Sequence, residues 1–138
     1  MNGGERVLVC GSRNTGDPDA TRKIIAQRLS ELPRDTKILH GGANGVDMWA
    51  DAIAYGMGIS SSVMVADWEQ HGRSAGILRN NNMLDTKPDL VIAFWDGESR
   101  GTRHTIEEAE RRGIPVHVVP IPAQTKSALP GAGAGEET

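Results

Sequence analysis

Short apolar runs alternate along this chain with longer stretches in which apolar residues recur at helical spacing. The short runs predict β-strands at residues 6–10, 37–39, 61–66, 90–95 and 116–119. The longer stretches predict helices at residues 18–32, 48–55, 72–84 and 102–112. The chain therefore alternates strand and helix from one end of the pattern to the other.

Local signals mark where these helices begin and end. Asp17 is placed to cap the first helix, and Pro18 suits its first position because proline lacks the N–H that is unpaired there. Gly56 or Gly58 is expected to end the second helix. The third helix is expected to anchor itself in the core through its apolar residues Ala75, Ile77, Leu78 and Leu84.

Alternation of this kind favours right-handed crossovers and a parallel sheet with helices on both faces. The run at 90–95 is the most hydrophobic, which indicates a central strand buried on both sides. We expect a Rossmann-like α/β three-layer sandwich with a mainly parallel five-stranded sheet, formed as one domain by residues 1–122. Residues 123–138 are rich in Gly, Ala, Pro and Glu, and we expect a disordered tail.

Polar and glycine-rich segments follow the predicted strands. In open parallel sheets, ligands bind beyond the carboxyl ends of the strands, where the strand order reverses. The segments that meet this expectation are Gly11-Ser12-Arg13, His40 to Asp47, Asp67-Trp68-Glu69 and Asp96 to Thr102. The sequence therefore predicts a binding site at the carboxyl ends of the strands.

The segment His40-Gly41-Gly42-Ala43-Asn44-Gly45-Val46-Asp47 joins a predicted strand to a predicted helix. Glycines there let the backbone approach a ligand closely, and the amides that open the helix carry partial positive charge. One interpretation is a cradle for a phosphate. The other is a tight turn without a ligand, in which Asp47 caps its helix through a pairing with Asn44.

The formal net charge is −3, which argues against a general nucleic-acid coat because such proteins carry a basic surface. Basic residues nevertheless gather in the segments near the strand ends. They are Arg13, Arg73, Arg79, Arg100 and Arg103, with His40, His71 and His104. A basic mouth on an acidic body favours a small anionic ligand, because the guanidinium fork suits phosphate and carboxylate.

Other classes of site are not supported by the pattern. No Walker phosphate loop is present, and the usual dinucleotide fingerprint is absent after the first strand. No zinc-like spacing occurs, so no metal and no cofactor are expected. The single cysteine, Cys10, is expected to be a buried small residue and indicates a reducing cytoplasm. No apolar run is long enough for a bilayer, so no membrane association is expected.

Five motifs occur in an order typical of a known family: Gly11-Ser12-Arg13, His40 to Asp47, Ala66-Asp67-Trp68, Arg79-Asn80-Asn81-Asn82-Met83 and Gly101-Thr102. Across about residues 6–119 the chain resembles the YspA-like, cpYpsA-related branch of the SLOG (SMF/DprA–LOG) superfamily. The resemblance implies a Rossmann-like domain that binds nucleotides or nucleotide-derived molecules. Many such domains are thought to be ligand sensors or processors in bacterial and phage conflict.

The enzymes in this superfamily are the lonely-guy phosphoribohydrolases, which cleave the N-glycosidic bond of nucleoside monophosphates. Arg79 and Met83 match their first signature, and Gly101 and Thr102 match part of the second. The position of the family's catalytic glutamate is Thr105, and threonine can neither activate water nor stabilise a ribosyl cation. The resemblance therefore implies binding, while hydrolysis stays an alternative.

Three hypotheses follow. The first is a module that binds a nucleoside phosphate or an ADP-ribose-like molecule, as a sensor or a sequestering protein, through Gly11, Ser12, Arg13, Gly41, Gly42, Ala43, Asn44, Gly45, Asp47, Asp67, Trp68, Arg79, Gly101 and Thr102. In it, Trp68 or Trp95 stacks on a base, and Asp47, Asp67 or Asp96 accepts ribose hydroxyls.

The second hypothesis is an enzyme that breaks an N-glycosidic or phosphoester bond, if so a nucleotide N-glycosidic hydrolase. Its candidate catalytic residues are Asp47, Glu98 and Arg79, in addition to Asp67 and Glu69. The third is DNA processing, which the acidic charge disfavours. The preferred partner is a small nucleotide-like ligand rather than a nucleic acid, and the small apolar helix faces permit a homo-oligomer.

Overall fold

A computed structural model describes residues 4–124, and all structural statements refer to these residues. The predicted disordered tail falls almost entirely on residues 125–138, which lie outside the described part. No helix among residues 4–124 combines the length and apolar character needed to cross a membrane.

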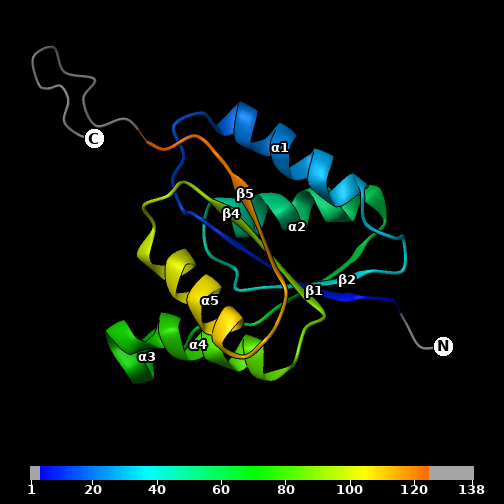
Figure 1. The fold of residues 1–138 in the computed structure, drawn as a ribbon. Coiled ribbons are helices and arrows are strands. Elements are labelled where there is room, and N and C mark those ends of the chain that lie inside the picture. Colours follow the sequence, from blue (N-terminus) through cyan, green and yellow to red (C-terminus); the bar gives the residue numbers. More distant parts are fainter. Residues whose placement is uncertain (1–3, 125–138) are drawn as a thin grey trace, which may run out of the picture.

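Five parallel strands form one sheet in the order β3-β2-β1-β4-β5 (Figure 1). The strands are β1 (Arg6–Gly11), β2 (Lys37–His40), β3 (Ser60–Val63), β4 (Leu90–Trp95) and β5 (Val116–Pro120). The chain builds outward from β1 to β3, then returns to the other side of β1 for β4 and β5. The expected five-stranded parallel sheet is confirmed.

Helices cover both faces of this sheet (Figure 1). Those of at least two turns are α1 (Pro18–Ser30), α2 (Val46–Met57), α4 (Ala75–Asp85) and α5 (Arg100–Arg111). Val7 and Val9 of β1 share a core with residues of α1 and α2, whereas Leu8 and Cys10 share the opposite core with α4 and α5. This alternation is the two-residue period of a strand buried on both sides, and it confirms the three-layer sandwich.

The predicted helix ends are largely confirmed. Asp17 caps α1 by accepting a hydrogen bond from the Ala20 amide at 3.0 Å, and Pro18 is the first helical residue. Gly58 ends α2 in the left-handed conformation, with φ of 76°. The strand expected at residues 61–66 is shorter, because β3 ends at Val63.

The segment expected to be one helix at residues 72–84 is divided. It begins with a 3-10 turn, η1 (Gly72–Ser74), and continues as α4. A single helical turn, α3 (Trp68–His71), precedes it. Ala75 and Leu84 are buried as expected, but Ile77 and Leu78 are 47% and 39% exposed. The prediction that these two anchor the core was wrong, and Ile77 faces the pocket described below.

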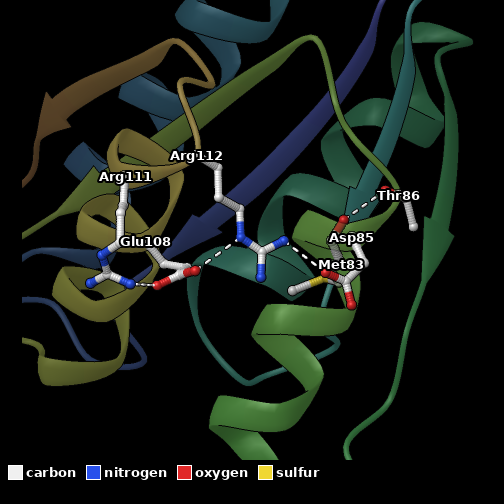
Figure 2. Close-up of polar contacts among 6 residues, drawn as sticks. All are labelled: Met83, Asp85, Thr86, Glu108, Arg111 and Arg112. Atoms are coloured by element: carbon white, nitrogen blue, oxygen red, sulfur yellow. Dashed lines mark hydrogen bonds and ion pairs between the residues drawn. The ribbon is translucent and has the colours of Figure 1, made fainter.

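Polar contacts hold α4 and α5 together near their carboxyl ends (Figure 2). Arg112 donates to Asp85 at 2.8 Å and to Glu108 at 3.0 Å, and Arg111 also pairs with Glu108. Because the helices run antiparallel to the strands, these contacts lie near the amino ends of the strands. The amino ends of α4 and α5 therefore lie together near the carboxyl ends of the strands.

Candidate functional site

The strand order reverses between β1 and β4, and a pocket of about 490 Å³ opens beyond their carboxyl ends. This is where open parallel sheets bind ligands, and the volume is in the range of small-molecule sites. The residues around it come from the end of β1, the segments after β1, β2 and β4, the amino ends of α2 and α5, helix α4, and the chain after β5. They are Cys10, Gly11, Ser12, Arg13, Asn14, Ala43, Asp47, Gly76, Ile77, Arg79, Asn80, Met83, Asp96, Glu98, Ser99, Gly101, Thr102, Thr105 and Gln124.

The segment after β1 is packed tightly against its neighbours. A Cβ at Gly11 would lie 2.6 Å from the Val46 Cβ and 2.7 Å from the Phe94 carbonyl oxygen, so only glycine fits there. Ser12 is buried and joins three segments. Its amide donates to the Phe94 carbonyl at 3.2 Å, its carbonyl accepts from the Val46 amide at 3.2 Å, and its hydroxyl accepts from the Asp96 amide at 3.3 Å. This segment thus fixes the pocket wall.

The amides of the glycine segment after β2 are engaged by the protein itself. The Gly41 and Ala43 amides donate to Asp47 Oδ2 at 3.1 and 3.2 Å, and the Gly42 amide donates to His40 Nδ1 at 3.0 Å. The Gly41, Gly42 and Ala43 amides are therefore not open to a phosphate, because Asp47 occupies two of them and His40 occupies the third. This corrects that part of the expected phosphate cradle. The expected pairing of Asp47 with Asn44 is also replaced by these contacts.

His40 is buried in a polar network behind this segment. Because its Nδ1 accepts from the Gly42 amide, the proton resides on Nε2, which donates to Asp51 Oδ1 at 2.8 Å. Asp51 also accepts from the Ser61 hydroxyl at 2.6 Å. The Ser61 bond, followed by the His40 bond, lowers the pKa of Asp51. His40 therefore orients the segment and does not face a ligand.

Burial governs the charges at the floor of the pocket. It raises the pKa of Asp47, against the opposing effects of the Ala43 amide, His40 and Arg79. Cys10 is buried, as expected, and burial raises the pKa of its thiol.

Arg79 reaches from α4 to the glycine segment. Its Nη1 donates to the Gly41 carbonyl oxygen at 2.6 Å, and its Nε donates to Asn80 Oδ1 at 3.0 Å. Burial lowers the pKa of Arg79; Asp47 opposes this effect, and the charge of Arg13 adds to it. The two guanidinium groups therefore repel each other across the site.

Arg13 is exposed, and its guanidinium lies 5.9 Å from the centre of the Trp68 ring. Within residues 4–124, neither Arg13 nor Arg79 has a carboxylate oxygen within 4.0 Å. Two cations thus face one hollow without an ion-pair partner in the described part of the chain.

The segment after β4 is organised by its own side chains. Asp96 Oδ1 accepts from the Glu98 and Ser99 amides at 2.8 and 2.9 Å, and Ser99 caps α5. The Trp95 indole donates to the Ser99 carbonyl at 3.0 Å and lies beside Arg103. Trp95 lines neither pocket of the site.

The second turn of α5 contains Thr105, the position at which the resemblance places the lonely-guy glutamate. Thr105 is buried, and its hydroxyl donates to the Gly101 carbonyl oxygen at 3.2 Å. Thr102 is also buried, with its hydroxyl 3.1 Å from that of Ser99. Thr105 thus closes its own helix turn and presents no charged group, whereas Glu98 lines the pocket from an exposed position.

A second pocket of about 390 Å³ adjoins the first and shares Arg13, Ala43 and Arg79 with it. Its other lining residues are Gly41, Gly42, Asn44, Val65, Ala66 and Trp68. Trp68 is 49% exposed and Val65 is 72% exposed, so this pocket has an apolar wall.

The structure brings twelve of the fourteen predicted ligand residues to one of these two pockets. Gly45 and Asp67 line neither. Gly45 has φ of 86° where the chain passes close to the Arg13 carbonyl, and Asp67 caps α3 by accepting from the Gln70 amide at 3.0 Å. Of the predicted basic mouth, Arg100, Arg103, His40, His71 and His104 also line neither pocket.

Several lining residues were not expected from the sequence, among them Asn14, Gly76, Ile77, Asn80, Ser99 and Gln124. Asn80 lies within a motif that was recognised, so that motif could have indicated it. Ile77 was assigned to the core because an apolar residue at the start of a helix looks the same in either role. Gln124 had no signal, since it was included in the predicted tail.

Comparisons with known proteins agree with this architecture. Residues 5–71 match the family described as the YspA, cpYpsA-related SLOG family. The Gene 61 protein of Mycobacterium phage D29 is 41% identical over 116 residues, which cover 80% of this chain and 93% of that protein.

Solved structures share the fold at low identity. DNA processing protein A from Streptococcus pneumoniae is 19% identical with a TM-score of 0.65, over 84% of this chain and 50% of that chain. The Moco carrier protein from Chlamydomonas reinhardtii is 15% identical with a TM-score of 0.61, over 83% of this chain and 75% of that chain.

Proposed function

Because the chain belongs to the YspA, cpYpsA-related SLOG family, we propose that it binds a nucleotide or a nucleotide-derived anion beyond the ends of β1 and β4. The proposed role is that of a sensor or sequestering module in bacterial or phage biology. Its resemblance to a phage protein supports that setting, and the single buried cysteine supports a reducing cytoplasm.

The observation that carries the proposal is the pair Arg13 and Arg79, which face the same hollow without an ion-pair partner among residues 4–124. A guanidinium binds phosphate through charge-assisted hydrogen bonds. A phosphate between these groups would also relieve the repulsion that contributes to the lowered pKa of Arg79. An anionic ligand therefore satisfies what the protein alone leaves uncompensated.

Helix ends add to this positive region. Gly76 and Ile77 of α4, and Gly101 and Thr102 of α5, bring the amino ends of both helices to the pocket. Each helix has at least eleven residues, so its partial positive charge is directed at the same space. Since Asp47 and His40 occupy the Gly41, Gly42 and Ala43 amides, we expect these helix ends and the guanidinium groups to supply the phosphate contacts.

Calorimetric titration with AMP, ADP and ADP-ribose tests the proposal. Arg13→Ala is the cleanest variant, because Arg13 is exposed and makes no hydrogen bond within the described residues. We expect it to weaken binding at least about tenfold, the loss of one charge-assisted contact. Arg79→Ala should do the same.

Arg34→Ala is the matched control. Arg34 is also exposed, but it precedes β2 and so lies at the amino ends of the strands, away from the pocket. Its removal changes the net charge equally and should leave affinity within about twofold. Equal effects of Arg13→Ala and Arg34→Ala would show that the ligand responds only to net charge, and the proposed site would be abandoned.

Nucleotide hydrolysis is the second candidate, and it rests on one observation, the exposed carboxylate of Glu98 at the pocket. Incubation with AMP, NAD and ADP-ribose, followed by chromatography for free base, tests it. Because Thr105 supplies no carboxylate, we expect no release of base. Release that Glu98→Gln abolishes would make the protein an enzyme.

A further inference from the structure

The second pocket lies beside the proposed anion site and has a different chemical character. We propose that the two pockets form one bipartite site for a nucleoside diphosphate linked to a sugar. The base lies in the second pocket, the diphosphate lies at Arg13 and Arg79, and the sugar lies in the first pocket. This inference rests on the proposed function and names its ligand class.

The two pockets meet at Arg13, Ala43 and Arg79, which line both. A ligand that enters both pockets therefore passes between two guanidinium groups. A diphosphate places two anionic centres there, whereas a single phosphate leaves one guanidinium with less compensation. The burial of Arg79 increases the benefit, because charge interactions strengthen as water is removed.

The second pocket suits a planar apolar group. Trp68 forms part of its wall and is 49% exposed, and Val65 beside it is 72% exposed. Neither side chain belongs to a core cluster. A base stacked on the indole would cover them and gain about 1 to 3 kcal/mol, as in other stacked bases.

Trp68 also lies close to the cations. The Arg13 guanidinium is 5.9 Å from the centre of the Trp68 ring. A base beside this indole is therefore adjacent to the charge that holds the diphosphate. The connection from base to phosphate in a nucleotide requires this adjacency.

The first pocket suits a sugar. The end of it formed by the segment after β4 and the start of α5 presents Asp96, Glu98 and Ser99. Asn14 adds a side-chain amide from the segment after β1. Carboxylates, a hydroxyl and an amide supply the mixture of donors and acceptors that sugar hydroxyls require.

Calorimetry with four compounds tests the inference: ADP-ribose, UDP-glucose, AMP and ribose 5-phosphate. We expect ADP-ribose or UDP-glucose to bind at least about tenfold more tightly than ribose 5-phosphate, since only the larger compounds fill both pockets. Trp68→Ala should remove at least about tenfold of the tighter compound's affinity. The same variant should leave ribose 5-phosphate within about twofold, because that compound has no base.

Two further variants distinguish stacking on Trp68 from a general effect of removing an exposed aromatic residue. Trp68→Phe preserves a stacking surface and should retain affinity within about threefold. It should also remove the quenching of tryptophan fluorescence that the base causes in the wild-type protein. Tyr55→Ala is the matched control, because Tyr55 is an aromatic residue that is 87% exposed on α2 and lines neither pocket.

The outcomes separate the two claims. Equal affinity of ribose 5-phosphate and both larger compounds, or no effect of Trp68→Ala, would overturn the bipartite site and leave the anion site intact. Failure of all four compounds to bind at millimolar concentration would overturn the proposed function and this inference together.

Discussion

Asp47 is the residue on which the shape of the site depends. Its carboxylate is nearly buried and accepts from the amides of Gly41 and Ala43. These bonds turn the backbone amides of the segment inward, while the Gly41 carbonyl oxygen accepts from Arg79. Asp47 thus acts as an internal anion that holds the segment between the two pockets.

Asp47→Ala removes the acceptor of two amides. We expect it to lower the free energy of unfolding by about 2 to 3 kcal/mol, because a buried donor without a partner carries its desolvation penalty. Asp47→Asn keeps one acceptor oxygen at the same position and should lose less than half as much. Urea unfolding at pH 7 measures both. A loss as large in Asp47→Asn would show that the charge, rather than the acceptor, holds the segment.

The pH dependence of stability tests the burial of the same carboxylate. Burial raises the folded-state pKa of Asp47 above its unfolded value of about 3.9. The folded protein therefore binds more protons than the unfolded protein above that pH, so stability falls as pH rises through this window. Relative to Asp47→Asn, the wild-type protein should lose stability from about pH 4 upward.

Asp51 supplies the opposite sign as a control. Its pKa is lowered by Ser61 and His40, so its contribution is present above about pH 3.9 and is lost as pH falls through the folded-state pKa. Relative to Asp51→Asn, the wild-type protein should lose stability toward acid. Slopes of the same sign for the two variants would contradict this account of the charges.

At the residue scale, the sequence predicted where the site residues lie better than what they do. Gly41, Ala43 and Asp47 were all expected at the site, and all line it. Their hydrogen bonds to one another could not be predicted. Asp47 lies six residues after Gly41, and its carboxylate reaches the Gly41 amide only because of the backbone conformation between them.

Among the elements, the amino end of α5 forms a wall of the first pocket, and there is open space beside Gly101. A Cβ at Gly101 would meet no atom within 4 Å, whereas a Cβ at Gly11 would meet Val46 and the Phe94 carbonyl. Gly101 thus lines the pocket without being required by the packing.

Gly101→Ala should therefore stabilise the fold by about 0.4 to 1 kcal/mol, because alanine restricts the unfolded chain and suits a helix. The Gly101→Leu variant should also fold. Its affinity for the nucleotide should fall at least about tenfold, because the leucine side chain narrows the pocket. Thermal unfolding and calorimetry measure the two effects. Gly11→Ala is the contrasting control and should destabilise the protein. Unimpaired binding by Gly101→Leu would place the ligand elsewhere.

The elements that the sequence predicted well are those whose residues all serve the core. The strand at residues 90–95 is found as β4 with its predicted bounds. The segment at residues 64–74 was predicted poorly, since it forms two short turns next to the site instead of strand and helix. Its exposed apolar residues, Val65 and Trp68, follow neither period because they face a pocket.

For the whole molecule, the parallel sheet with helices on both faces could be predicted because strands and helices alternate. The strand order was not predicted and comes from the structure. The sheet order then determines which segments meet. The second pocket could not be predicted, because it depends on how α3 and the glycine segment face each other around Trp68.

Amide NMR of the protein titrated with ADP-ribose tests whether the anion binds where the strand order reverses. The largest shifts should fall on residues 11–14, 76–80 and 96–102, which border the first pocket. Residues 33–36 and 86–89, at the amino ends of β2 and β4, should change little. Saturable shifts centred on those residues, or no saturable shifts, would contradict binding at the carboxyl ends of the strands.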